Sequence, residues 1–137
     1  MESETIKHIV QFSEVDSLRI VWHGNYIKYI EEARDKFCQR KGWGFECLEK
    51  NNCVTPIYDL EMHYLHPAVL GDELTVTATL QPKKGAKLIF DYEIKRADGT
   101  LILTGQTTQL FTDMKGNLIA TRPEFFDTNI EVQNNKA

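Results

Sequence analysis

The sequence predicts an α+β domain in which one long helix is followed by a largely antiparallel sheet that wraps around it. Two patterns predict this class. After Tyr26 the apolar residues recur at steps of three and four, which is the spacing of a helix with one buried face. From Tyr58 to Phe111 they alternate with polar residues, which is typical of strands. The connections between those strands are too short to hold a crossover helix, so the strands should be antiparallel.

The first strand and the helix are predicted from the N-terminal third of the chain. Residues 6–13 read IKHIVQFS and alternate apolar with polar side chains over most of their length. The helical spacing starts at Tyr26 and stops near Gly42. Arg40 and Lys41 complement the negative end of the helix dipole, and Gly42 can take the left-handed conformation that ends many helices.

Four long strands are predicted after a less regular stretch at residues 43–55. Short segments rich in turn-forming residues separate them. The apolar faces of the four strands lie at Tyr58–Tyr64, Leu74–Leu80, Leu88–Ile94 and Leu101–Phe111. One helix leaves much of such a sheet and its edges unprotected, so we expect a homodimer or a homotetramer.

Length and composition indicate one ordinary globular domain. A chain of 137 residues can close one hydrophobic core, and we expect residues 1–137 to form a single domain with a polar tail at about 124–137. The apolar fraction of 42% includes no run approaching the ~18 residues that cross a bilayer, so no membrane span is expected. The N-terminus, MESETIKHIV, lacks the features of a signal peptide, which favours a cytoplasmic location.

Nucleic acid, metals and cofactors are not expected as partners. The net charge of −4 disfavours nucleic-acid binding. The spacings of Cys38, Cys47 and Cys53 match no common metal or redox motif, so we expect reduced, structural thiols. His63 and His66 lie three positions apart in a predicted strand and therefore point to opposite faces, which argues against a metal site.

The segment FSEVDSLRIVWHGNYIKYIEEAR, residues 12–34, combines an acid with the start of a helix. Asp16 precedes His23 by seven positions, and HGNY opens the predicted helix. The first N–H groups of a helix lack internal partners and can donate to an oxygen that gains negative charge. A carboxylate beside them can attack a carbonyl or activate water, as acyl transfer requires. On residue types alone, however, an aspartate before a helix is more often a cap or turn residue.

The same segment resembles the opening motif of the 4-hydroxybenzoyl-CoA thioesterase family of hotdog-fold enzymes, in which F-x-x-x-D precedes a VVYHxxY or IVWYxNY turn and an EAR-like helix. The segment YDLEMHYLHPAVLGDELTVTATL is similar to that family's strand, proline-containing turn and GDEL strand. The segment DGTLILTGQTTQLFTD is similar to its last hairpin. The resemblance covers roughly residues 5–123, which is nearly the whole chain.

This resemblance implies a hotdog fold, dimers joined edge to edge, and hydrolysis of an acyl-CoA thioester at the dimer interface. By position, Asp16 would attack the thioester or activate water, and the catalytic pair would include His23. Backbone N–H groups of His23, Gly24, Asn25 and Tyr26 would polarise the thioester carbonyl. The short-chain acyl-CoA members have a histidine at the position of His23, whereas the hydroxybenzoyl enzymes have a tyrosine, so this chain leans towards the short-chain members. The expected substrate is a short-chain or aryl acyl-CoA.

A basic turn is the expected contact for the phosphates of CoA. Lys83, Lys84 and Lys87 lie between two predicted strands, where related enzymes place basic residues against the nucleotide. A solvated turn is an equally good interpretation of the same residues.

One residue departs from the family pattern, and two others match a different branch of the fold. The family commonly has a glycine just before the hydrophobic pair of VVYH, but this chain has Arg19, which would change the turn and the pocket. Another branch of hotdog thioesterases keeps its carboxylate on the central helix, where this chain has Glu31 and Glu32. Because Asp16 is present, we expect these two to be surface or pairing residues.

Three alternatives stay open beside an acyl-CoA thioesterase. The thioester could be carried by an acyl carrier protein. A hotdog enoyl-thioester hydratase is disfavoured, because its Asp and His typically lie five apart around an N-P pair, whereas Asp16 and His23 lie seven apart without a proline. A non-catalytic acyl-CoA binding module is the third, since a fold does not establish activity.

Overall fold

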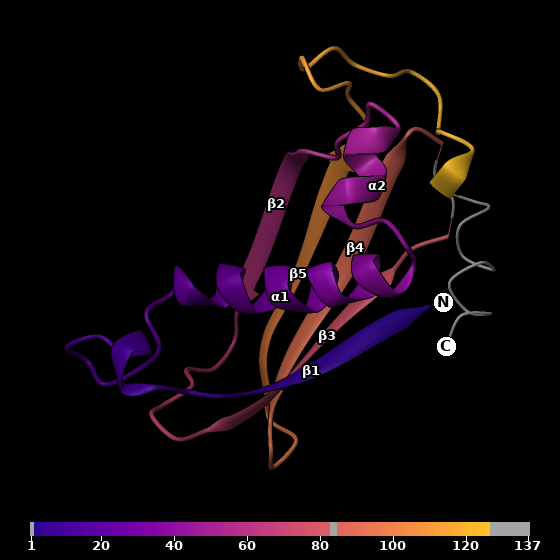
Figure 1. Ribbon diagram of the computed structural model, residues 1–137. Helices are drawn as coiled ribbons and strands as arrows, with labels where there is room; N and C mark the ends of the chain where they lie inside the picture. Colours follow the sequence, from indigo (N-terminus) through magenta and orange to yellow (C-terminus); the bar gives the residue numbers. More distant parts are fainter. Residues whose placement is uncertain (1, 83–84, 127–137) are drawn as a thin grey trace.

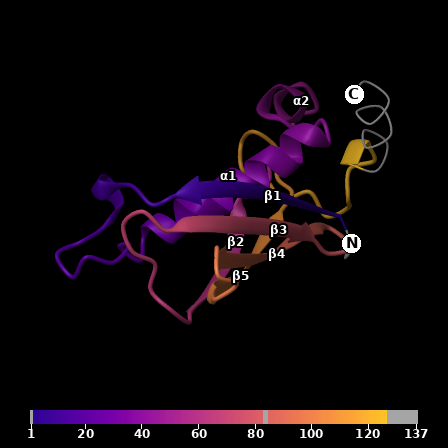
Figure 2. The ribbon, with the colours of Figure 1, turned by 90° about the horizontal axis from the view of Figure 1, so that it is seen from below.

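The computed structural model describes residues 2–82 and 85–126, which form a five-stranded antiparallel sheet with both α-helices on one face (Figure 1, Figure 2). The strand order across the sheet is β1-β3-β4-β5-β2. The elements are β1 (Ser3–Ile9), a 3-10 turn (Phe12–Glu14), α1 (Asn25–Arg40), α2 (Phe45–Lys50), β2 (Ile57–Tyr64), β3 (Glu73–Leu80), β4 (Lys87–Arg96) and β5 (Leu101–Leu110).

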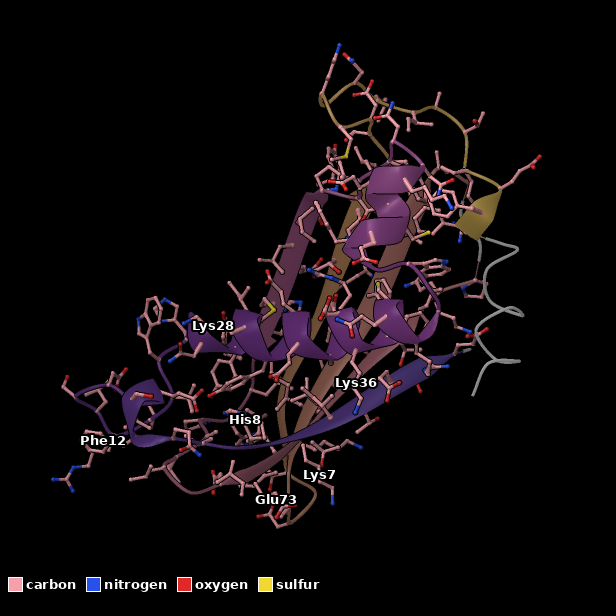
Figure 3. The ribbon with its side chains drawn as sticks, in the orientation of Figure 1. Lys7, His8, Phe12, Lys28, Lys36 and Glu73 are labelled. Carbon is pink, nitrogen blue, oxygen red and sulfur yellow. The ribbon has the colours of Figure 1, made fainter. Side chains whose placement is uncertain are left out.

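The predicted helix and the four later strands are confirmed, and the N-terminal prediction is partly wrong. The strand expected at residues 6–13 ends at Ile9. Phe12 begins the 3-10 turn instead and is 80% exposed, because the chain leaves the sheet there (Figure 3). The stretch at 43–55, expected to be irregular, contains α2.

The core lies between α1 and the inner face of the sheet. The buried face of α1 consists of Tyr26, Tyr29, Ile30, Ala33 and Phe37. The buried residues of β3 and β4 alternate with less buried ones as predicted, and the rings of Phe37 and Phe90 meet edge to face with their centroids 5.2 Å apart. Each large side chain buried in this way stabilises the fold by roughly 1.5–3 kcal/mol.

The C-terminal end of α1 is fastened to β1. Gly42 follows the helix with a φ of 77°, the left-handed conformation predicted for it. Arg40 pairs with Glu4 at 2.8 Å, and the buried ammonium of Lys41 pairs with Glu2. Burial lowers the pKa of Lys41, while the adjacent carboxylate gives its charge a partner.

The β2 side of the sheet is uncovered by comparison. The helix α1 packs on β1 and β3. On β2, Leu60 and Tyr64 pair with the inward residues Thr107 and Leu103, yet they are 41% and 48% exposed. The sequence pattern therefore predicted the face of these side chains correctly, but the described residues leave them partly uncovered.

The first residues of the segment expected as a C-terminal tail pack on the domain. Phe126 is buried, and its ring lies 4.9 Å from that of Trp43 and 4.8 Å from that of Phe111. The rest of the predicted tail, 127–137, lies outside the described residues. No helix in the described part of the chain has the length and apolar character needed to cross a membrane.

Candidate active site

Asp16 lies in a tight turn between β1 and α1. Val15 and Val21 pair across this turn, and the Asp16 N–H donates to the carbonyl of Ile20 at 2.9 Å. One carboxylate oxygen of Asp16 accepts the N–H of Leu18 at 2.8 Å. The role of turn residue expected from residue type is therefore real. No hydrogen bond is recorded to the second oxygen within the described residues, so the carboxylate can still meet a substrate.

Arg19 occupies the position where the resembling family commonly has glycine. Its φ is 66°, in the left-handed region that glycine enters without strain. A residue with a Cβ pays roughly 1–2 kcal/mol there. Arg19 thus keeps a glycine-like backbone and adds strain to the turn that holds Asp16.

Glu14 joins this turn to β1 and α1 by hydrogen bonds. Figure 3 shows one of its partners, His8, between β1 and α1. Its carboxylate accepts hydrogen bonds from His8 Nε2 and the Gln11 N–H, both at 2.8 Å. Its backbone carbonyl accepts from the Trp22 N–H at 3.0 Å and from Asn25 Nδ2 at 2.9 Å. Burial alone would raise the pKa of Glu14, but the hydrogen bonds from Gln11 and His8 hold it below its usual value. The sequence reading did not single out Glu14.

Two backbone donors lie just ahead of α1. The N–H groups of His23 and Gly24 have no recorded acceptor among the described residues. The N–H of Asn25 is engaged, because it donates to the carbonyl of Trp22 at 2.9 Å. Of the four backbone groups expected to polarise a carbonyl, His23 and Gly24 are therefore the available pair ahead of the helix, and the N–H of Asn25 is engaged. The N–H of Tyr26, in the first turn of the helix, has no backbone acceptor among the described residues either.

A side chain at Gly24 would displace the ring of Trp22. The ring of Trp22 lies directly over it, and a Cβ at Gly24 would overlap that ring. The close approach of the indole holds the backbone of this turn from one side.

An apolar cavity of about 270 Å³ opens beside these donors. Aromatic and aliphatic side chains line it: Ile20, Val21, His23, Tyr26, Tyr64, Leu65, His66 and Pro67. Tyr26 is buried in its floor, and its hydroxyl accepts the N–H of Ala68 at 3.2 Å. Asp16 is not part of this lining, although the turn that it belongs to supplies Ile20 and Val21. Tyr64 and His66 were not predicted as site residues, because they come from the far end of β2 and the segment after it.

Of the three lysines expected to bind CoA, the structure describes Lys87, which lies away from this site within one chain. Lys83 and Lys84 lie outside the described residues. Lys87 begins β4 opposite Leu110, whereas Tyr64 pairs with Leu103. Seven residues of β5 separate those two positions, which is about 23 Å at 3.3 Å per residue.

A second, wider hollow of about 640 Å³ lies along the exposed side of α1, next to α2 and the start of β2. Glu31 and Glu32 line it and are exposed, which agrees with the surface position expected for them. Cys38 also borders it, and burial raises the pKa of its thiol to about 12. A thiol this hard to ionise is a poor nucleophile, in line with the expected structural role.

The described residues contain no cluster of three or more His, Cys, Asp or Glu side chains suited to a metal ion. His63 pairs with Glu61 at 2.8 Å, and His66 bonds the carbonyl of Leu101 at 3.1 Å. The two histidines thus make separate contacts.

Comparison with known proteins decides the family. Residues 10–130 match the model of the Thioesterase-like superfamily. The chain belongs to this superfamily. The thioesterase-like domain is 25% identical over 104 residues to "Putative acyl-CoA thioesterase YneP" of Bacillus subtilis, covering 76% of this chain and 75% of that protein. It is 24% identical over 93 residues to "Acyl-CoA thioester hydrolase YbgC" of Escherichia coli O157:H7, covering 68% and 69%.

Solved structures support the same fold. The structure of Slr0204, a 1,4-dihydroxy-2-naphthoyl-CoA thioesterase from Synechocystis, superposes with a TM-score of 0.82 at 19% identity, covering 94% of this chain and 96% of that one. The expected hotdog fold of this thioesterase-like domain is confirmed.

Proposed function

We propose that this protein is an acyl-CoA thioesterase that hydrolyses a short-chain or aryl acyl-CoA to the free acid and CoA. The observation that carries the proposal is the pair of N–H groups at His23 and Gly24, which have no backbone acceptor among the described residues and lie at an apolar cavity that His23 lines, beside the turn of Asp16. The names of the YneP and YbgC relatives support the same activity.

The reaction divides between the carboxylate and the backbone donors. The carboxylate of Asp16 attacks the thioester carbon or removes a proton from an attacking water. The carbonyl oxygen then gains negative charge, which the N–H groups of His23 and Gly24 stabilise at the positive end of α1. The C–S bond breaks and CoA leaves as the thiolate. In the nucleophilic route water then hydrolyses the anhydride between the acyl group and Asp16, which releases the acid and restores the carboxylate; in the general-base route the acid forms directly and Asp16 passes the proton to the departing thiolate or to solvent. The cavity of about 270 Å³ is near the lower limit for ligand pockets, which favours a short or single-ring acyl group.

A thiol-release assay over short-chain, aryl and long-chain acyl-CoAs tests the function. We expect hydrolysis by the wild type and a loss of about 10³-fold or more in kcat for Asp16→Asn, because the essential carboxylate becomes a neutral amide of the same size. Unchanged turnover in Asp16→Asn would remove Asp16 from the mechanism. No release from any CoA ester would remove the activity, and the same panel on acyl carrier protein would then test the alternative donor.

We further propose that two copies pair through β2. Its outer edge has no partner strand among the described residues, and Leu60 and Tyr64 are 41% and 48% exposed beside it. In a two-fold antiparallel pairing, Tyr64 would lie opposite the start of the partner's strand. That places the hollow along the partner's α1, and the end of the sheet that carries Lys87, next to the cavity at His23. The active site would then be completed by the second copy.

Sedimentation of Leu60→Lys tests this dimer. A charge without a partner in an apolar interface costs a few kcal/mol, so we expect association to weaken about 100-fold and thioester hydrolysis to fall with it. Glu93→Lys, on the outer face of β4, is the control that should keep both. A Leu60→Lys protein of unchanged mass would contradict the β2 interface, and the wild-type mass separates a homodimer from a homotetramer.

The cytoplasmic location stays a prediction.

A further inference from the structure

The peptide that joins His23 to Gly24 is held by a side chain from the opposite edge of the fold. Its N–H, on Gly24, is one of the two free donors of the site. Its carbonyl, on His23, accepts a hydrogen bond from the hydroxyl of Tyr64 at 3.3 Å. Tyr64 comes from the last residue of β2, 41 positions along the chain.

Ring contacts keep the Tyr64 hydroxyl at this place. The ring of Tyr64 meets the ring of His23 edge on, with the centroids 6.3 Å apart. It also lies 5.7 Å from the ring of Tyr26, which is buried. The side chain is nevertheless 48% exposed, so its hydroxyl carries little of the packing energy of the core.

Peptide geometry turns this bond into a property of the donor. A trans peptide is planar, and its C=O and N–H point in opposite directions. A hydrogen bond that fixes the carbonyl of His23 therefore fixes the direction of the Gly24 N–H as well. Accepting a hydrogen bond at the oxygen also polarises the N–H of the same peptide, which makes it a stronger donor.

The neighbouring peptide is fixed by other groups. This peptide joins Trp22 to His23, and its carbonyl, on Trp22, accepts the N–H of Asn25. The second free donor, on His23, belongs to that backbone-bonded peptide. The donor on Gly24 is the one whose peptide is bonded by a side chain.

We propose that Tyr64 is a positioning residue of the hydrolysis: its hydroxyl orients the His23–Gly24 peptide so that the Gly24 N–H meets the thioester oxygen as that oxygen gains charge. This role rests on the proposed thioesterase function. Tyr64 does not touch the reacting atoms itself.

Tyr64→Phe tests the role, because it removes the hydroxyl and keeps the ring. Direct loss of an oxyanion donor costs about 10²–10³ in kcat, and a misaligned donor costs less, so we expect kcat to fall roughly tenfold with KM unchanged. The matched control is Thr5→Val, which removes another exposed hydroxyl, bonded to Thr77 at 3.0 Å on the outer face of the sheet. It should leave kcat and KM as they are.

A spectroscopic measurement separates orientation from general loosening of the site. In Asp16→Asn, which stops turnover, a bound acyl-CoA should show a thioester C=O stretch lowered by the polarising donors. In the double variant Asp16→Asn with Tyr64→Phe, we expect that shift to shrink while the affinity for the acyl-CoA holds.

Two results would overturn the proposal: a kcat for Tyr64→Phe equal to that of the wild type, or a C=O stretch that is the same in the two backgrounds. A wild type that binds acyl-CoA without hydrolysing it would defeat the proposed function alone. The C=O stretch would then still decide the role of Tyr64, because it needs binding and not turnover.

Discussion

The inner face of the sheet has two halves that differ in what covers them. On the β1, β3 and β4 side, α1 lies across the strands, and Leu74, Val76, Phe90 and Ile94 are fully buried. On the β2 side, Leu60 and Tyr64 point the same way and stay half-exposed. The difference teaches that one half of the face carries the stability of the single chain. The other half is left open for a substrate and, as proposed, a second copy.

A matched pair of truncations should give the largest effect. It tests whether the two halves of the sheet contribute differently to the free energy of unfolding. Leu74→Ala empties a fully buried site and should lower the free energy of unfolding by about 2–5 kcal/mol. Leu60→Ala makes the same chemical change at a 41% exposed site and should cost less than about 1 kcal/mol. Urea unfolding of dilute protein measures both. Equal losses would mean that β2 is as well covered as β3 within one chain.

Replacing Glu14 by glutamine measures how much its charge stabilises the turn that precedes α1. Hydrogen bonds to a charged group contribute about 1.5–3 kcal/mol, so Glu14→Gln should lower the free energy of unfolding by about 2 kcal/mol at pH 7. The variant keeps the size of the side chain, and only the charge is removed. Glu93→Gln is the control, because Glu93 is exposed and forms a long ion pair, with 3.8 Å between its Oε2 and Lys95 Nζ. This variant should change the free energy of unfolding little.

The pH dependence of this effect has a definite sign. The pKa of Glu14 is lower in the folded protein than its usual value, so its carboxylate stabilises the fold above that usual value of about 4.3. The advantage of the wild type over Glu14→Gln should vanish as the pH falls from there through the lowered folded pKa. Unfolding curves at pH 7, 5, 4 and 3 measure it. A difference that stays constant down to pH 3 would show that the charge of Glu14 is not what matters.

The smallest expected effect concerns the strained turn beside Asp16. Arg19→Gly removes a left-handed conformation at a residue with a Cβ, which should raise the free energy of unfolding by about 0.5–1 kcal/mol even after the added freedom of the unfolded chain. Leu18→Gly, one position earlier, has no positive φ to relieve and should be destabilising. Thermal unfolding of both variants measures the difference. A destabilised Arg19→Gly would mean that the Arg19 side chain makes a stabilising contact that outweighs its backbone strain.

The tertiary structure added to the site what local patterns could not contain. Asp16, His23 and the start of α1 were predicted because the acid, the turn and the helix lie within one short segment. Tyr64 was predicted only as part of the apolar face of its strand. It became a candidate site residue only when β2 was placed at the edge of the sheet, with its last residue beside His23. Glu14 gave no signal of its own, since the four hydrogen bonds that it accepts come from His8, Gln11, Trp22 and Asn25, which lie in different parts of the fold.

The sequence by itself determined the fold class, the extent of α1, the four long strands and the position of the acid before the helix. These follow from periodicity and turn chemistry, which act between residues close in the chain. The tertiary structure decided the order β1-β3-β4-β5-β2, the half of the sheet that α1 covers, and the approach of Tyr64 to His23. The physical reason is that alternation states which side chains share a face. The backbone hydrogen bonds that join strands have the same chemistry for any partner, so the order of strands depends on how the whole chain packs.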